Sequence, residues 1–77
     1  MATGFVLIDT MPEREHDAFS ALQKVKEIVE LNVIFGEHDI IAKVEAYDID
    51  AVGQIVVDKI RPVEGVMDTK TLIGLDL

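Results

Sequence analysis

The sequence predicts an α+β domain in which two helices cover one face of a four-stranded antiparallel sheet. Three observations support this prediction. Segments whose apolar side chains alternate every second residue are separated by segments with helical spacing. Proline, glycine and aspartate stand at the junctions. The resulting order is strand, helix, strand, strand, helix, strand within 77 residues, a length that fits one domain.

The first half of the chain contains a strand, a helix and a second strand. Residues 4–11 are apolar and β-branched, and Pro12 ends this strand because proline cannot donate a ladder hydrogen bond. Residues 13–26 have helical spacing, with acids in the first half and lysines near the end, as the helix dipole favours. Residues 28–35 are again apolar and β-branched, which predicts the second strand.

The second half repeats this order after a tight turn. Residues 36–39 form the turn, and its shortness makes residues 40–47 an antiparallel partner of the second strand. Asp48 is a good N-cap, and Pro62 stops the helix that follows. Residues 66–75 predict the last strand. Right-handed crossovers put both helices on one face, which is the ferredoxin-like βαββαβ arrangement.

Alternation along the predicted hairpin separates the side chains into two faces of the sheet. The face toward the helices takes Val29, Leu31, Val33, Ile40, Ala42 and Val44. The other face takes Glu30, Asn32, Ile34, Ile41, Lys43 and Glu45, with Phe5, Leu7 and Asp9 or their neighbours from the first strand. This second set holds large apolar residues, and a core this small needs further stabilisation. We therefore expect two sheets to pair face to face in a dimer; the simpler alternative is a half-hydrated sheet.

Composition argues against several classes of function. The chain has 15 acidic and 7 basic residues and a formal charge of −8, which repels phosphate backbones, so we expect no direct contact with nucleic acid. It has no cysteine and only two histidines, so we expect no metal site and no cofactor. Its apolar runs are far shorter than the roughly 18 residues of a membrane span. We expect no membrane partner and a cytoplasmic location.

The turn at residues 36–39 is the first candidate site. Gly36 permits a positive φ, and Asp39 can accept hydrogen bonds from backbone amides. These properties suit a plain hairpin turn; alternatively, Asp39 binds the ammonium group of a small ligand while amides near Gly36 bind its carboxylate. His38 beside Asp39 resembles half of a general-base pair, but adjacent strand residues point to opposite faces and no nucleophile is apparent.

Two threonines of the last predicted strand are the second candidate site. Thr69 and Thr71 are two residues apart, so their hydroxyls share one side of the strand. They suit β-propensity alone, or they bind a polar ligand group or a neighbouring subunit. Four strand carboxylates can form an acid–base pair or a magnesium site only where two converge, and we expect a solvated or interface role for them instead; these are Asp9, Glu30, Glu45 and Asp68.

These motifs, in this order, resemble a known family. Gly36-Glu37-His38-Asp39, the alternating strand at 40–45 and Gly65-Val66-x-x-Thr69-x-Thr71 resemble the hallmark of the RAM domain. This domain is the C-terminal, ligand-binding half of the Lrp/AsnC transcriptional regulators. The resemblance extends over residues 4–75.

The resemblance implies a ferredoxin-like domain whose sheets pair in dimers, and dimers that assemble into rings such as octamers or decamers. It also implies amino-acid effectors that bind at contacts between dimers, and no catalytic residue. Carried over to this sequence, the ligand-binding residues are Gly36, Glu37, His38, Asp39, Thr69 and Thr71.

The chain begins at the first strand, so we expect residues 1–77 to be a single RAM domain without a helix-turn-helix module. The expected function is amino-acid binding and oligomerisation, which modulates transcription through a full-length Lrp/AsnC partner. One alternative is a small dimeric ferredoxin-like enzyme of the monooxygenase or isomerase type, with His38 or Glu45 as base; a deep pocket between sheet and helices would favour it. The other is a purely structural oligomerisation module, which no amino acid would stabilise.

Overall fold

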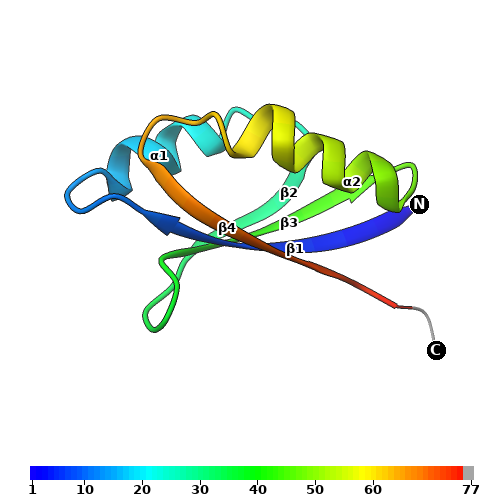
Figure 1. The fold of residues 1–77 in the computed structure, drawn as a ribbon, viewed down its shortest axis with the longest axis horizontal. Coiled ribbons are helices and arrows are strands. Elements are labelled where there is room, and N and C mark those ends of the chain that lie inside the picture. The colour runs from blue at the N-terminus through cyan, green and yellow to red at the C-terminus, as the bar shows by residue number, and fades with distance from the viewer. Residues whose placement is uncertain (76–77) are drawn as a thin grey trace.

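The computed structural model describes residues 1–75 and confirms the predicted order of elements. The elements are β1 (Ala2–Thr10), α1 (Glu15–Leu22), β2 (Ile28–Val33), β3 (Ile40–Ala46), α2 (Ile49–Ile55), a π-helical continuation η1 (Val56–Ile60) and β4 (Val66–Ile73). The four strands are antiparallel in the order β2-β3-β1-β4, so β2 and β4 form the edges. Both helical segments cover the same face of this sheet (Figure 1). The ferredoxin-like α+β fold is therefore confirmed.

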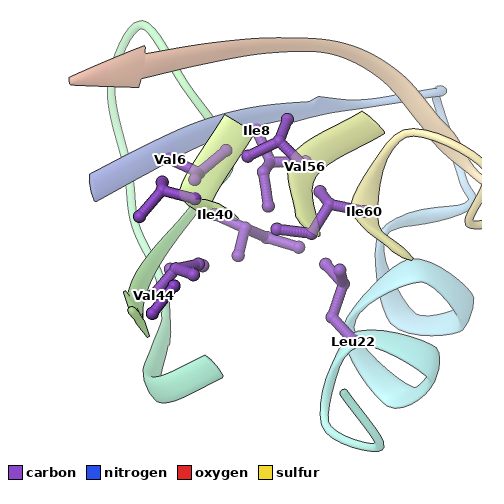
Figure 2. Close-up of a cluster of buried hydrophobic side chains, with 10 residues drawn as sticks. Val6, Ile8, Leu22, Ile40, Val44, Val56 and Ile60 are labelled. Carbon is purple, nitrogen blue, oxygen red and sulfur yellow. The ribbon is translucent and has the colours of Figure 1, made fainter. Parts of the chain in front are cut away.

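The core lies between this covered face and the helices. The inward side chains of β1 and β3, apart from that of Ala2, are buried, as the alternation predicts. Leu22 of α1 and Val56 and Ile60 of η1 pack against them (Figure 2). The buried cluster consists of Val6, Ile8, Leu22, Ile40, Ala42, Val44, Ala46, Val52, Val56 and Ile60. Apolar side chains thus fill the layer between sheet and helices.

The second helix follows its sequence signals more closely than the first. The Asp48 side chain accepts a hydrogen bond from the amide of Ala51 at 2.8 Å, which confirms the predicted N-cap. The first helix is shorter than the predicted 13–26, because Glu13 has a φ of +69° and α1 begins only at Glu15. Lys24 and Lys26 follow the end of α1, so the predicted pairing of basic residues with its last turn is wrong.

The second strand departs from simple alternation. Ile28 pairs with Val44, whereas Glu30 pairs with Lys43, so a β-bulge leaves Val29 as the extra residue. Ile28, and not Val29, therefore packs against the core opposite Val44. The prediction for Val29 is wrong, because an inserted residue reverses the alternation on one side of the bulge.

The face opposite the helices carries the mixed set that the sequence predicts. Phe5 is 36% exposed and Leu72 47% exposed, and the two are register partners on β1 and β4. Lys43 on β3 already has an acidic partner in its own chain, Glu30, at 3.4 Å. Within residues 1–75, no helix is long and apolar enough to cross a membrane.

Candidate ligand-binding site

The hairpin turn, residues 36–39, is tied to both neighbouring strands. Gly36 has a φ of +153°, in the range where glycine is favoured, and a Cβ at this position would meet open space. The carbonyl oxygen of Asp39 accepts a hydrogen bond from the amide of Ile34 at 2.9 Å. The amide of Asp39 donates to the carbonyl of Ile8 at 3.0 Å. The turn is therefore fixed against the end of β1.

The Asp39 carboxylate also contributes to this attachment. Its Oδ2 accepts hydrogen bonds from the backbone amide of Thr10 at 2.8 Å and from the Thr10 hydroxyl at 3.0 Å. Thr10 is only 5% exposed, so this carboxylate satisfies two donors that water barely reaches. The sequence suggests a carboxylate available to a ligand; the structure gives one of its two oxygens a role in folding. A contact 29 positions apart carries no local sequence signal.

His38 pairs with a different acid from its sequence neighbour. Its Nδ1 lies 2.9 Å from Oδ1 of Asp9 on β1, and both side chains are about three-quarters buried. The turn thus carries two side-chain contacts to β1, one from His38 and one from Asp39. These two contacts fix the position of the turn relative to β1.

The two threonines lie on β4 with their side chains on the same face, as predicted. Thr69 is the register partner of Ile8 and Thr71 that of Val6, and both partners point toward the helices. The hydroxyl of Thr69 accepts a hydrogen bond from Nε of Arg61 at 3.1 Å. Arg61 is a polar neighbour that the sequence did not reveal, because the turn between η1 and β4 brings it there.

Gly65, which precedes β4, is required by close packing. Its φ is +97°, and a Cβ there would lie 3.0 Å from the carbonyl oxygen of Arg14. The Gly65 carbonyl accepts a hydrogen bond from the amide of Met11 at 2.8 Å, which joins the start of β4 to the end of β1. The Gly-Val part of the motif is therefore a structural joint.

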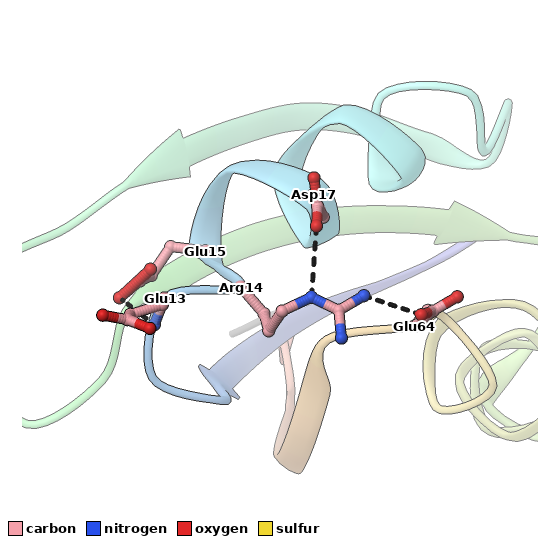
Figure 3. A network of polar contacts seen from close by, with 5 residues as sticks. All are labelled: Glu13, Arg14, Glu15, Asp17 and Glu64. Atoms are coloured by element: carbon pink, nitrogen blue, oxygen red, sulfur yellow. Dashed lines mark hydrogen bonds and ion pairs between the residues drawn. The ribbon is translucent and has the colours of Figure 1, made fainter.

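An exposed ion-pair network reinforces the same joint. The Arg14 guanidinium donates to Glu64 at 2.7 Å and to Asp17 at 3.1 Å (Figure 3). The hydrogen bond to Glu64, followed by that to Asp17, raises the pKa of Arg14 above its already high usual value. Arg14 therefore stays charged at all relevant pH values, and its guanidinium is paired with Asp17 and Glu64 of its own chain.

The hairpin turn and the threonines share one end of the sheet but lie on different sides of β1. Ile40, next to the turn, pairs with Ile8, and Ile8 pairs with Thr69 on its other side. Two strand spacings, about 10 Å, therefore separate the turn from Thr69. In Figure 1 the hairpin projects away from the helices. A single chain thus does not gather all six predicted residues into one pocket.

Three of the hollows on the surface of the described chain bear on where a ligand can bind. The largest of these three, of about 660 Å³, lies at the other end of the sheet, where Tyr47, Asp48, Asp50 and Leu75 line it. A shallow one of about 80 Å³ lies on the uncovered face beside Lys43. The third, of about 320 Å³, lies at the start of β4, and we call it the edge niche; its lining residues are Arg61, Val66, Met67, Asp68 and Thr69.

The strand carboxylates do not assemble into a metal site in this part of the chain. Asp9 and Asp68 are register partners on adjacent strands, so two of the four carboxylates share one face of the sheet, whereas Glu30 pairs with Lys43. Within residues 1–75, no group of three or more histidine or carboxylate side chains is placed to hold a metal ion. The polar groups at this end of the sheet are suited to binding through hydrogen bonds and charge.

The fold, the Gly-x-x-Asp turn and the two-threonine strand together define an effector-binding domain of the type found in transcriptional regulators. A family model described as the Lrp/AsnC ligand binding domain matches residues 3–76. The chain belongs to this family.

Individual relatives agree with this assignment. An uncharacterised HTH-type transcriptional regulator of Pyrococcus abyssi is 34% identical over 77 residues, which cover 96% of this chain and 51% of the relative. The chain thus spans about half the length of the curated relatives it matches. The crystal structure of FFRP-DM1 is 32% identical with a TM-score of 0.89 and covers 97% of this chain and 100% of that one. Escherichia coli AsnC is 26% identical with a TM-score of 0.90, over 99% of this chain and 52% of AsnC.

Proposed function

We propose that this chain is an amino-acid-binding module that modulates transcription through a regulator of the Lrp/AsnC family. Its membership of this ligand-binding family carries the proposal. The polar groups at one end of the sheet supply the proposed site: the hairpin turn with Gly36, Glu37, His38 and Asp39, and the β4 strand with Thr69 and Thr71.

Two structures of similar fold suggest the first ligand to test. A transcriptional regulator of Neisseria meningitidis, 19% identical with a TM-score of 0.87, was solved in complex with L-methionine. The feast or famine regulatory protein of Mycobacterium tuberculosis, 23% identical with a TM-score of 0.85, was also solved with L-methionine. At these identities the likeness concerns the fold, so L-methionine serves here as a first probe.

A thermal-shift panel of the twenty amino acids tests the proposal. A ligand at ten times its Kd stabilises the folded state by about 1.4 kcal/mol. For a domain of this size that raises Tm by about 6–11 °C. We expect at least one amino acid to produce a saturable shift of this size. A panel without any shift would refute amino-acid binding and leave a structural oligomerisation module as the better account.

The uncovered face of the sheet supports self-association as part of this function. Phe5, Ile41 and Leu72 lie on this face, and half-exposed apolar side chains that cluster are typical of an interface. A second copy placed sheet to sheet would cover them, and dimers of this kind are the units of the octameric or decameric rings that we propose. Because this face also carries the charged residues Lys43 and Glu30, it favours one relative orientation of the two paired sheets over non-specific contact.

Sedimentation of a matched pair of variants tests the sheet-to-sheet contact. Leu72→Lys places a charge on the uncovered face, whereas Val57→Lys places one on η1 at similar exposure, 51% against 47%. We expect Leu72→Lys to lower the sedimentation coefficient toward that of a monomer and Val57→Lys to leave it unchanged. Equal behaviour of the two variants would refute this use of the face.

The same observations disfavour the enzyme alternative. An enzyme of this fold would need a deep pocket between sheet and helices, but core side chains such as Ile8 and Ile60 fill that layer. The three hollows lie outside it. A net charge of −8 disfavours direct DNA contact, so we propose that a full-length regulator in the cytoplasm is the partner through which the module acts.

A further inference from the structure

The edge niche has the size and position of a small-molecule site. Its volume of about 320 Å³ lies at the lower end of the range for ligand cavities, about 300–1,000 Å³. It opens at the start of β4, an edge strand, between that strand and the residue that follows η1. A ligand no larger than an amino acid fits such a volume.

The niche contains a positioned cation with free donors. Among lysine and arginine side chains of the described residues, Lys43 and Arg61 line one of these three hollows, and Lys43 is already paired with Glu30. Arg61 donates from Nε to Thr69 at 3.1 Å. No other hydrogen bond of Arg61's side chain is present within residues 1–75. Its two terminal nitrogens therefore remain able to bind a carboxylate through two parallel bonds.

The local backbone fixes where this guanidinium emerges. The amide of Arg61 donates to the carbonyl of Val56 five residues earlier, at 2.8 Å, so Arg61 closes the π-helical turn η1. Pro62 follows and cannot continue the helix. The bond to Thr69 then holds the side chain against β4.

An acid and two apolar residues complete the lining. Oδ1 of Asp68 accepts a hydrogen bond from the amide of Thr69 at 2.9 Å. Within the described residues its second oxygen has no hydrogen-bond partner. Val66 and Met67 supply apolar surface beside these charges. The niche thus presents a cation, an anion and an apolar surface, which are the three features that a zwitterionic amino acid requires.

We propose that the edge niche binds the backbone of an α-amino acid, with its carboxylate on Arg61 and its ammonium group on Asp68. This inference rests on the proposed function and assigns the carboxylate to a side chain of the β4 region, not to the amides of the hairpin turn. A zwitterion suits a chain of charge −8 better than a simple anion does, because its ammonium group offsets the long-range repulsion.

The larger hollow lacks this chemistry. Asp48 and Asp50 are the charged side chains that line it, and Asp48 is already the N-cap of α2. No lysine or arginine of the described residues borders it; Met1 supplies an α-amino group but no guanidinium that can form two parallel bonds. Asp48 and Asp50 would repel an amino-acid carboxylate placed beside them, so the smaller edge niche is the better site despite its size.

Calorimetric titration with a pair of probes tests the assignment. L-Methionine carries both charged groups, whereas L-methioninamide keeps the ammonium group and lacks the carboxylate. If another amino acid gives the larger thermal shift, that amino acid and its amide replace the pair. The proteins are the wild type, Arg61→Gln and Lys24→Gln. Lys24→Gln is the matched control. Lys24 is an exposed cation in the turn after α1, so this substitution removes one positive charge at a position outside the niche.

We expect Arg61→Gln to weaken binding of the amino acid about tenfold or more, because a charged hydrogen-bonded pair is lost. The amide should bind the wild type and Arg61→Gln alike, and Lys24→Gln should bind both probes as the wild type does. Two results would overturn the assignment of the carboxylate to Arg61 while leaving amino-acid binding by the wild type intact. Arg61→Gln could bind the amino acid with wild-type affinity, or it could lose affinity for the amino acid and for the amide to the same extent. Failure of the wild type to bind any amino acid would overturn both proposals.

A second variant tests the ammonium half independently of Arg61. Asp68→Asn keeps an acceptor for the amide of Thr69 and removes the negative charge. It should weaken the amino acid and its amide to the same extent, because both probes carry the ammonium group. Unchanged affinity for both would overturn the role of Asp68.

Discussion

Two aspartates at one end of the sheet have opposite relations to the rest of the fold. Asp39 in the hairpin turn accepts two hydrogen bonds from Thr10, which is nearly buried and 29 positions away. Asp68 in the edge niche accepts one bond, from the amide of the next residue, and is exposed. The same functional group thus organises the fold at one position and keeps free binding capacity at the other. The comparison teaches that a sequence motif can mark the residues that build a site, while the groups available to a ligand lie beside it.

Replacing the two aspartates by alanine gives the largest expected contrast. Asp39→Ala leaves the amide and hydroxyl of Thr10 without partners, at a cost of about 3 kcal/mol in the free energy of unfolding. Asp68→Ala should change it by less than about 0.5 kcal/mol, as is usual for exposed positions. Urea unfolding at fixed protein concentration measures both.

Asp39→Asn is the control for this contrast, because its side-chain carbonyl can still accept from Thr10. It should recover a large part of the stability lost in Asp39→Ala. Equal stability of Asp39→Ala and Asp68→Ala would contradict the structural role assigned to Asp39.

Replacing the two motif glycines, Gly65 and Gly36, by alanine should also lower the stability by different amounts. Gly65→Ala forces a Cβ to within 3.0 Å of the Arg14 carbonyl at a φ of +97°, so we expect it to cost about 2–3 kcal/mol. Gly36→Ala meets open space and carries only the backbone strain, about 1 kcal/mol. Thermal unfolding of both variants measures the difference, and a Gly36→Ala variant that is less stable than Gly65→Ala would contradict it.

Thr69→Val sharpens the account of the edge niche with a smaller effect. The substitution keeps the side-chain shape and removes the oxygen that accepts from Arg61. Because Arg61 is then less well positioned, we expect a few-fold weaker affinity for the amino acid and a change in unfolding free energy within about 0.5 kcal/mol. The same substitution at Thr3, which lies on β1 at the other end of the sheet and has no side-chain hydrogen bond among the described residues, should leave the affinity unchanged.

The ion pair between Lys59 and Glu27 lies away from both aspartates, and removing it should have the smallest effect on stability, one that depends on pH. Lys59 of η1 donates to Glu27 before β2, and this hydrogen bond lowers the pKa of Glu27 below its usual value. A lowered pKa means that the stabilisation is complete above the unfolded-state value, about 4.3, and is lost as the pH falls through the lower folded-state value. The Tm difference between the wild type and Lys59→Gln should therefore be constant from neutral pH to about pH 5 and shrink below about 4.3. A difference that grows in acid would contradict this sign.

The sequence predicts the parts of this fold that depend on neighbouring residues. Asp48 caps α2 because its side chain reaches an amide three residues ahead, a purely local contact. The alternation of β3 correctly separates the buried Ile40 and Val44 from Ile41 and Lys43. The order of elements follows from the same local patterns, and so does the placement of Thr69 and Thr71 on one side of β4.

The parts that sequence alone did not provide depend on contacts between distant segments. The bulge at Val29 is a feature of the pairing between β2 and β3, and alternation on one strand cannot reveal it. The bonds from Thr10 to Asp39 arise because β1 runs beside the start of β3. Arg61 reaches Thr69 because a π-helical turn and Pro62 redirect the chain. The candidate site was therefore located by motif, whereas its proposed charge partners required the structure.

Chemical-shift mapping of the backbone amides tests the central claim most directly. Isotope-labelled, deuterated protein is titrated with L-methionine, or with the amino acid that gives the largest thermal shift. The account predicts saturable changes centred on the amides of residues 61 and 66–69, with smaller changes in the hairpin turn. Changes confined to residues 36–39, or none at any amide for any of the twenty amino acids, would contradict it.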